Sequence, residues 1–266
     1  MIVKPRRPYF VNVQEQVSSA ANAEDLRLLD ADIDTLFVMS ASGRIERVND
    51  PEHSSAPRLF FAGCRFGNVA RVRYDVDDRV ARKVLEVAAE EPPWRDPDAT
   101  PGCLGRIVKL LSDRQPATIA FHALIYKLSN GLRHEHPAPI VRGDSPEGRQ
   151  MIARFAERGM PAYAVDAGFR GVGDFWEPWC AALDAGDMAS VAFAARLGKM
   201  GAEVGVYTFP KYRGHGFAAA VTASWATIPS LERRALFYST HKSNRSSRRV
   251  AARLGLRMIG ASVSIA

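Results

Sequence analysis

A short glycine-rich turn between a strand and a helix is the sequence feature that most restricts how this chain folds. Residues 203–208 have the pattern of a strand, a turn with two glycines follows at 213–216, and an alanine-rich helix begins near Phe217 and ends before Pro229. Glycine adopts backbone conformations that other residues avoid, so such a turn brings backbone N–H groups close to a ligand. These groups, with the partial positive charge of a helix N-terminus, predict a binding site for phosphate groups.

Positive charge is concentrated in the same part of the chain. The 266 residues carry a formal net charge of +7, yet the stretch from Arg196 to the C-terminus holds twelve Lys and Arg residues against two acids, Glu203 and Glu232. A surplus of this kind predicts an anionic partner, which is a nucleic acid, a membrane surface or a phosphorylated small molecule. The nucleotide motifs GxxxxGK[ST] and GxGxxG are both absent.

Composition excludes several classes of protein. A hydrophobic content of 47% with 24% charged residues is typical of a globular chain. Cys64, Cys103 and Cys180 lie far apart without a CxxC motif, which argues against a disulfide scaffold or a cysteine zinc site and favours a reducing, cytoplasmic location. The chain has no apolar run of membrane-spanning length, and residues 1–10 lack the apolar core of an export signal. Neither a membrane location nor export is therefore expected.

A proline-rich break at residues 134–139 divides the chain into two predicted domains, 1–137 and 138–266. The first is predicted to be an α/β domain of unknown role, in which no catalytic spacing of residues can be recognised. Its predicted elements are a helix over 22–30 capped by Asn22, strands at 35–39, 45–48, 58–63 and 68–74, helices at 77–90 and 104–111, and a mixed segment at 118–128.

The second predicted domain places an antiparallel meander in front of the glycine-rich turn. Its predicted elements are a strand at 140–142, a helix from the cap Ser145 to Gly159, strands at 179–183, 190–197 and 203–208, the turn and its helix, a strand at 236–240, and a helix at 245–254.

This order of elements resembles the acyl-CoA-binding region of the GNAT N-acetyltransferase superfamily. Arg213, Gly216 and Ala218 occupy the defined positions of its loop pattern, [Q/R]-x-x-G-x-[G/A]. The family pattern continues with a fifth strand, an Asn, a small residue three positions later, and a Gly-aliphatic pair that closes the next helix. The matching residues here are Leu236–Thr240, Asn244, Ser247 and Gly255-Leu256. The resemblance covers roughly residues 138–266.

The resemblance implies an α/β fold with a mixed sheet whose fourth and fifth strands splay apart around the pantetheine arm of acetyl-CoA. Acetyl-CoA would be a co-substrate, and no metal is expected. Asn244 and Ser247 would lie near the cofactor. The arm would contact backbone groups of Val206, Tyr207 and Thr208, and the pyrophosphate would contact those of Arg213, Gly214, His215, Gly216, Phe217 and Ala218.

The implied reaction is direct attack of an amine on the thioester, catalysed by positioning and by polarisation of the carbonyl. Glu203 is the candidate general base, since it is the only acid between Asp187 and Glu232, although it could also be a surface carboxylate or part of an ion pair. Many family members carry a Tyr seven residues after the Asn as general acid, and here that position is Ala251. The remaining candidates are Tyr238, which could equally be a core residue, Ser239, Thr240, Tyr207 and a water molecule.

Several alternatives stay open at this level. Asn244 could also cap the following helix, and His134 and His136 have metal-ligand spacing but lack a third ligand nearby. Besides an N-acetyltransferase, the chain could be a degenerate CoA-binding sensor or interaction domain, or a nucleic-acid-binding module that uses the basic residues 241–257. The preferred partners are acetyl-CoA and an amine acceptor of unknown identity, with neither nucleic acid nor membrane, and a homodimer is left open.

Overall fold

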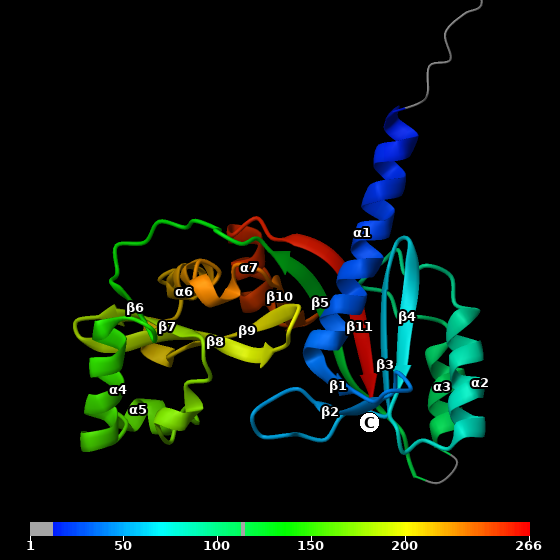
Figure 1. Cartoon of the computed structure of the whole chain (residues 1–266), viewed down its shortest axis with the longest axis horizontal. Coiled ribbons are helices and arrows are strands. Elements are labelled where there is room, and N and C mark those ends of the chain that lie inside the picture. Colours follow the sequence, from blue (N-terminus) through cyan, green and yellow to red (C-terminus); the bar gives the residue numbers. More distant parts are fainter. Residues whose placement is uncertain (1–12, 113–114) are drawn as a thin grey trace, which may run out of the picture.

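The computed structural model describes residues 13–112 and 115–266. Its main feature is a nine-stranded mixed sheet with helices on both faces, beside which a two-stranded hairpin is formed by β1 and β2 (Figure 1). The strand order in the large sheet is β4-β3-β11-β5-β10-β9-β8-β7-β6. The predicted mixed α/β fold class is confirmed.

The strands are β1 (Phe37–Met39), β2 (Ile45–Val48), β3 (Leu59–Cys64), β4 (Gly67–Val72), β5 (Ile119–Leu128), β6 (Ile140–Arg142), β7 (Trp179–Asp184), β8 (Asp187–Leu197), β9 (Gly201–Thr208), β10 (Ala235–His241) and β11 (Arg257–Ile265). The α-helices are α1 (Val13–Leu36), α2 (Asp78–Ala89), α3 (Leu104–Leu111), α4 (Pro146–Arg158), α5 (Ala162–Val165), α6 (Phe217–Trp225) and α7 (Arg245–Arg253). Short 3₁₀ turns lie at Val172–Asp174, Pro210–Tyr212 and Pro229–Leu231.

The first helix is longer than its sequence pattern predicts. Asn22 lies inside α1 rather than at its start, and Thr35 belongs to the last turn of α1 rather than to a strand. Both expectations were therefore wrong. Leu29 and Ile33, one turn apart, are fully buried against the sheet. Packing of this apolar side explains why the helix continues past residue 30, because tertiary contacts override weak local preferences.

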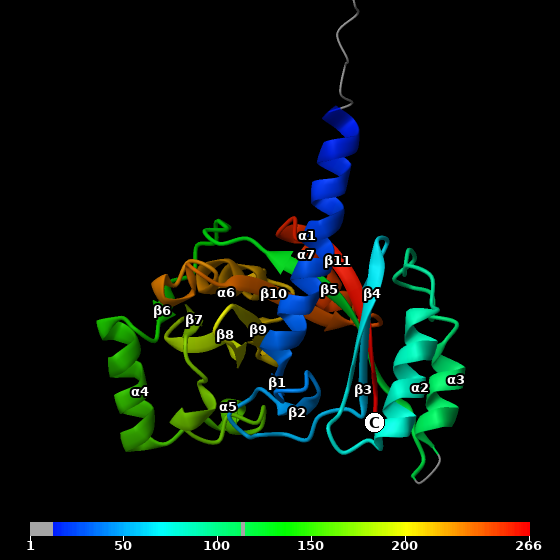
Figure 2. The same cartoon turned by 45° about the vertical axis from the view of Figure 1, so that its right-hand side comes forward.

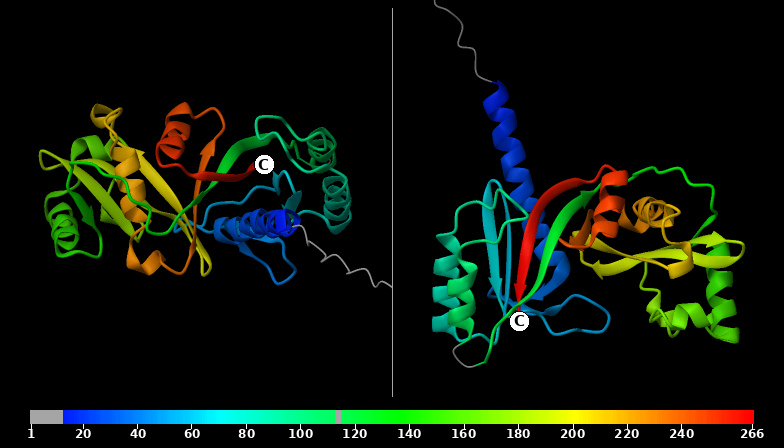
Figure 3. Two further views of the ribbon diagram at one scale, coloured as in Figure 1. Left: turned by 90° about the horizontal axis from the view of Figure 1, so that it is seen from above. Right: turned by 180° about the vertical axis from the view of Figure 1, so that it is seen from behind.

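The two faces of the large sheet carry different helices (Figures 2 and 3). Alternate residues of β10 show this directly: Phe237 packs in the cluster beneath α1, whereas the Tyr238 hydroxyl contacts Ser247 of α7. The face of Phe237 is covered by α1, α4 and α5, and the opposite face by α2, α3, α6 and α7. A ligand lying between two strands of this sheet would therefore meet different helices on its two sides.

The two predicted domains interlock within this one sheet. Strand β5, from the predicted N-terminal domain, lies between β10 and β11, and it pairs antiparallel with both. The predicted boundary at 137/138 falls in the connection between β5 and β6. The boundary stays a prediction, and the sheet is continuous across it.

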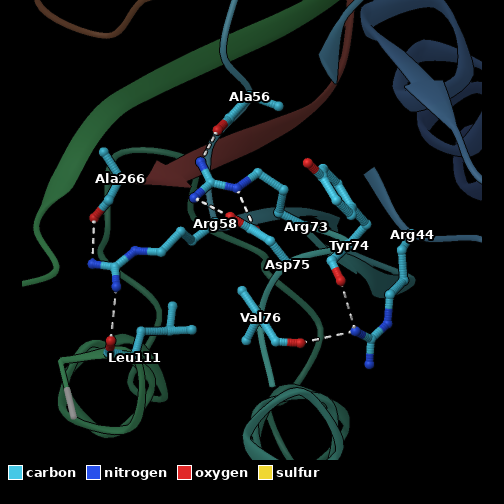
Figure 4. A network of polar contacts seen from close by, with 9 residues as sticks. All are labelled: Arg44, Ala56, Arg58, Arg73, Tyr74, Asp75, Val76, Leu111 and Ala266. Atoms are coloured by element: carbon cyan, nitrogen blue, oxygen red, sulfur yellow. Dashed lines mark hydrogen bonds and ion pairs between the residues drawn. The ribbon is translucent and has the colours of Figure 1, made fainter. Parts of the chain in front are cut away.

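Arginine side chains join the ends of several elements in the N-terminal half (Figure 4). Arg58 donates hydrogen bonds to the carbonyl oxygens of Leu111 at 2.9 Å and Ala266 at 3.1 Å. Arg73 donates to the carbonyl oxygen of Ala56 at 2.6 Å. These contacts tie α3, the loop before β3 and the end of β11 together.

In the part of the chain that the structure describes, no helix has both the length and the apolar composition needed to cross a bilayer. Residues 1–10, on which the expectation against an export signal partly rests, lie outside the described residues.

Candidate functional site

The site begins where β9 and β10 separate. These strands form the one parallel pair of strands in the large sheet, within the residues that the structure describes. They pair over three residues each, ending at Glu203 opposite Phe237. Beyond this point β9 continues to Thr208 and β10 to His241 without pairing to each other. The splay expected of the fourth and fifth strands is thus present, and it leaves one backbone edge of each strand open.

The glycine-rich turn lies beyond the end of β9, and α6 starts directly after it. Gly214 and Gly216 have φ angles of +86° and +91°, in the left-handed region that glycine tolerates best. Gly216 is the N-cap of α6 and offers no side chain to the first turn of the helix. No acceptor within the described residues receives the five N–H groups from Gly214 to Ala218. Five unpaired donors at a helix N-terminus can donate hydrogen bonds to an anion.

Cationic and aromatic side chains border this turn. A Cβ atom at Gly216 would lie 3.2 Å from Nη1 of Arg253 on α7 and 3.4 Å from the ring of His136. Nε2 of His136 lies 3.0 Å from the carbonyl oxygen of His215, and its ring packs on Phe217. Arg213 folds back, and its Nε donates to the carbonyl oxygen of Thr208 at 3.2 Å. His136 is therefore part of the packing around the turn, and no group of three potential metal ligands occurs among the described residues.

The remaining candidates for the cofactor arm lie along the open edge of β9. Val206 packs on the face of α6, whereas Tyr207 points to the opposite face and contacts the rings of Phe169 and Phe209. The hydroxyl groups of Thr208 and Ser190 are 2.8 Å apart. The backbone of Val206–Thr208 is held by β8 on one side and is unpaired toward β10 on the other.

Glu203 is buried at the closed end of the splay, with 8% of its surface exposed. Its carboxylate accepts a hydrogen bond from the Ser239 hydroxyl of β10, and Arg196 of β8 lies opposite it in the strand register. Burial raises the pKa of Glu203, while the Ser239 hydrogen bond and the charge of Arg196 act in the lowering direction. Glu203 is thus not the surface carboxylate that its sequence context allowed.

Asp32 of α1 joins this cluster, and the sequence analysis missed it. It is 1% exposed, and neither of its carboxylate oxygens has a hydrogen-bond partner among the described residues. Burial and the nearby charge of Glu203 raise the pKa of Asp32 well above its usual value. The sequence gives no signal for this contact, because Asp32 is one acid among several on a helix far from Glu203 in the chain.

Tyr238 lies on the other side of the sheet from Glu203. It is 4% exposed, its hydroxyl contacts the Ser247 hydroxyl and lies 3.3 Å from the Ser247 carbonyl oxygen, and burial raises its pKa. Ala251 is buried one helical turn after Ser247. A strand residue therefore places a phenol hydroxyl beside Ser247 of α7, one helical turn before Ala251.

Asn244 acts as a helix cap. Its side-chain oxygen accepts a hydrogen bond from the N–H of Ser247 at 3.1 Å, which satisfies one free donor in the first turn of α7. Its capping role follows from these contacts, and its contact with a cofactor stays a prediction. Ser239 and Thr240, the other sequence candidates for the acid, lie on opposite faces of β10: Ser239 bonds to Glu203, and Thr240 is buried.

The arrangement is that of an α/β protein with a turn of unpaired N–H groups at the open end of a splayed strand pair and a buried carboxylate at the closed end. The two ends of the splay suit different kinds of chemistry. The turn suits a pyrophosphate, the unpaired strand edges suit an extended polar chain, and the carboxylate suits proton transfer.

No protein-family model and no curated protein sequence matches this chain. Among solved structures, it is similar to a GNAT-family acetyltransferase from Colwellia psychrerythraea at 16% identity and a TM-score of 0.38, covering 59% of each chain. It is similar to a GCN5-related N-acetyltransferase from Kribbella flavida at 15% identity and a TM-score of 0.39, covering 61% of each chain. This chain thus spans less than two thirds of the length of either structure.

A longer match exists to a tandem GNAT protein from the clavulanic acid biosynthesis pathway. It covers 85% of this chain and 80% of that one, at 14% identity and a TM-score of 0.41. These solved structures belong to the superfamily that the sequence resembles. Since the TM-scores lie below 0.5 and the identities are low, neither substrate nor mechanism transfers from them to this chain.

Proposed function

We propose that the protein is an acetyl-CoA-dependent N-acetyltransferase that acts by direct transfer to an amine. The observation that carries this proposal is the position of the unpaired N–H groups of Gly214–Ala218 at the open end of the β9–β10 splay. A turn that binds pyrophosphate, continuous with two unpaired strand edges, suits a ligand with a diphosphate at one end and an amide-containing arm at the other.

In this proposal the backbone N–H groups of the turn hold the pyrophosphate, and the positive charge around them favours it. Arg253 lies beside Gly216, and Arg245, Arg248 and Arg249 are exposed on the same helix, α7. The arm lies in the splay along Val206–Thr208, so the thioester points toward Glu203 and Phe237, where the strands close. The apolar side of α7, with Ala251 and Leu254, packs inward, which leaves its basic side for the cofactor.

The chemistry needs two proton movements. The amine nitrogen forms a bond to the thioester carbon, and the C–S bond breaks with its electron pair going to sulfur. Glu203 accepts one proton from the nitrogen, and Tyr238 gives one proton to the departing sulfur. The raised pKa of Glu203 makes it a stronger base than an exposed carboxylate.

The faces of the sheet support this division of roles. Glu203 points to the face covered by α1, α4 and α5, while Tyr238 points to the face covered by α6 and α7. The amine would then approach from one side and the thiolate be protonated from the other. On the amine side, a cavity of about 440 Å³ is lined by residues from the β1–β2 hairpin region, the segment 173–177 and β8. It offers room for an acceptor, whose identity stays open.

Binding of acetyl-CoA is the first test. Acetyl-CoA is expected to raise the melting temperature of the wild-type protein and to have no such effect on Gly216→Trp, whose side chain would fill the turn. Gly43→Trp is the matched control, because Gly43 also has a positive φ of +73° with open space around it, in the β1–β2 turn. Gly43→Trp should keep the shift. The absence of any shift with the wild-type protein would refute the proposal.

Transfer is the second test. Release of CoA is measured with a panel of amino acids, polyamines, aminoglycosides and peptide N-termini as acceptors. Amine-dependent release of CoA is the expected result. Binding of acetyl-CoA without release by any acceptor would instead indicate a CoA sensor, and salt-sensitive binding to duplex DNA without a response to acetyl-CoA would indicate a nucleic-acid-binding module.

A further inference from the structure

Asp32 is the buried acidic side chain that the proposed chemistry leaves unused. Its carboxylate oxygens have no hydrogen-bond donor among the described residues, although the side chain is 1% exposed. Carboxylates that are buried and ionised are normally paired or hydrogen-bonded, because isolated burial of a charge is very costly. An acid without donors is therefore expected to be neutral.

The packing of α1 places Asp32 beside the closed end of the splay. Thr35, three residues later and on the same side of α1, lies against the start of β9: a Cβ atom at Gly201 would be 2.1 Å from its Oγ1. Asp32 is one helical turn earlier on the same side of α1, which packs on β9, and the charge of Glu203 acts on it. The segment that sequence patterns assign to a separate domain thus contributes a side chain to the candidate active site.

The charges around Asp32 also favour its neutral form. The charged or titratable side chains on elements that pack near α1 are Glu203 on β9, Arg196 on β8 with Asp50, Lys127 on β5, Cys64 on β3, Arg71 on β4 with Asp30, and Arg257 on β11 with Asp25. The one that acts on the pKa of Asp32 is the negative charge of Glu203, which raises it together with burial. Two carboxyl groups in one buried place do not both ionise readily.

The two carboxyl groups differ in what stabilises a negative charge. Glu203 accepts a hydrogen bond from Ser239 and lies opposite Arg196, whose Nη2 is 3.8 Å from Asp50. Asp32 has no such partner. The charge therefore resides on Glu203 and the proton on Asp32.

This inference rests on the proposed function. We infer that Asp32 is a positioning residue for Glu203. Asp32 stays protonated, so the two side chains together carry one negative charge, and that charge is on Glu203, the proposed base. Ionisation of Asp32 would bring a second negative charge into the contact between α1 and β9. That contact would loosen and admit water to Glu203. The inference predicts that stability falls as the pH rises while folded Asp32 keeps its proton, that turnover falls at alkaline pH, and that both losses depend on Asp32.

Thermal unfolding tests the proton on Asp32 without any substrate. Below pH 4 Asp32 is protonated in both states. Above pH 4 the unfolded chain releases this proton and the folded protein keeps it, so the wild-type protein loses stability as the pH rises until Asp32 ionises in the folded state. Asp32→Asn removes this loss. We expect the melting temperature of the wild type to fall relative to Asp32→Asn by about 3 °C per pH unit over that range.

Glu24→Gln is the matched control, since Glu24 is an acid on the same helix with an exposed side chain. Its melting temperature should follow the wild-type curve closely. Parallel curves for the wild type and Asp32→Asn would overturn the inference. Because this measurement needs neither acetyl-CoA nor an acceptor, it decides the protonation of Asp32 even if the proposed function fails.

Turnover against pH then tests the positioning role. Asp32→Asn should keep turnover within about 3-fold of the wild type at neutral pH, because the amide resembles a neutral carboxyl group, and it should retain turnover at alkaline pH where the wild type declines. A loss in Asp32→Asn as large as that in Glu203→Gln would make Asp32 itself the base and overturn the inference.

Discussion

Two regions of this protein are rich in positively charged side chains, and they differ in how their donors are used. The cavity of about 1200 Å³ between α2, α3 and the end of β4 is the larger feature. Its Arg58 and Arg73 donate to carbonyl oxygens of the chain itself (Figure 4). At the turn 214–218, by contrast, the N–H groups have no acceptor within the described residues. A region whose donors are already bonded is held together by them, and a region whose donors are free can bind something else.

The acidic side chains follow the same division. In the large cavity Arg73 pairs with Asp75 at 2.7 Å and Arg106 with Glu90 at 3.0 Å, so two of its cations have acidic partners. Near the splay, Asp32 has no partner, and Glu203 has a hydroxyl donor in place of a close ion pair. The size of a cavity thus says less about function than the presence of unpaired polar groups.

The largest expected effect is at Glu203. Glu203→Gln keeps the size and the hydrogen bond to Ser239 but cannot accept a proton, so kcat for acetyl transfer should fall by about 100-fold. The acid limb of the wild-type pH profile should lie above the ordinary range of a glutamate, because burial raises the pKa of Glu203 and the ionised form is the active one. Initial rates of CoA release across the pH range measure both.

Acetyl-CoA binding separates this effect from misfolding. The rise in melting temperature caused by acetyl-CoA should be unchanged in Glu203→Gln, and Glu232→Gln, an exposed acid of the same quarter of the chain, should have wild-type turnover. Wild-type turnover in Glu203→Gln would remove the catalytic role from the closed end of the splay.

The second prediction concerns the stability of the large cavity between α2, α3 and the end of β4. Arg58→Met keeps the aliphatic stem but leaves the carbonyl oxygens of Leu111, Pro116 and Ala266 without this donor, so the free energy of unfolding should fall by about 2 kcal/mol. Chemical denaturation measures this loss. The affinity for acetyl-CoA, from isothermal titration, should stay the same.

Arg79→Met is the control for this region, because Arg79 lines the same cavity and has an exposed side chain. Its unfolding free energy should lie within about 0.5 kcal/mol of the wild type. If either variant weakened acetyl-CoA binding, the large cavity would be part of the ligand site and the contrast between the two regions would be false.

The sequence predicts the two regions unequally. The turn follows from local rules, since Gly214, Gly216 and the start of α6 are adjacent in the chain and the spacing alone indicates a phosphate site. The capping roles of Ser145 and Asn244 are local in the same way, and both are confirmed.

Long-range features could not be predicted from such rules. The place of β5 between β10 and β11 depends on pairing between segments over 100 residues apart, for which a single sequence gives no register. The place of Asp32 near Glu203 depends on how α1 packs across the sheet, and the same packing explains why α1 continues past residue 30. Local patterns therefore predict the turn, its helix and Glu203 as a candidate, and they give no signal for Asp32.

The smallest expected effect tests whether Tyr238 takes part in acetyl transfer or only packs beside the splay. Tyr238→Phe keeps the ring and removes the hydroxyl that contacts Ser247, and turnover with acetyl-CoA should fall by about 10-fold. With an acetyl aryl thioester, whose leaving group departs readily as an anion, the loss should be much smaller, because no proton is needed there. Tyr126→Phe, on the neighbouring strand with its ring 6.3 Å from that of Tyr238, should show wild-type rates with both. Equal losses with both thioesters would mean that Tyr238 acts through packing, and the proton for the sulfur would then come from water.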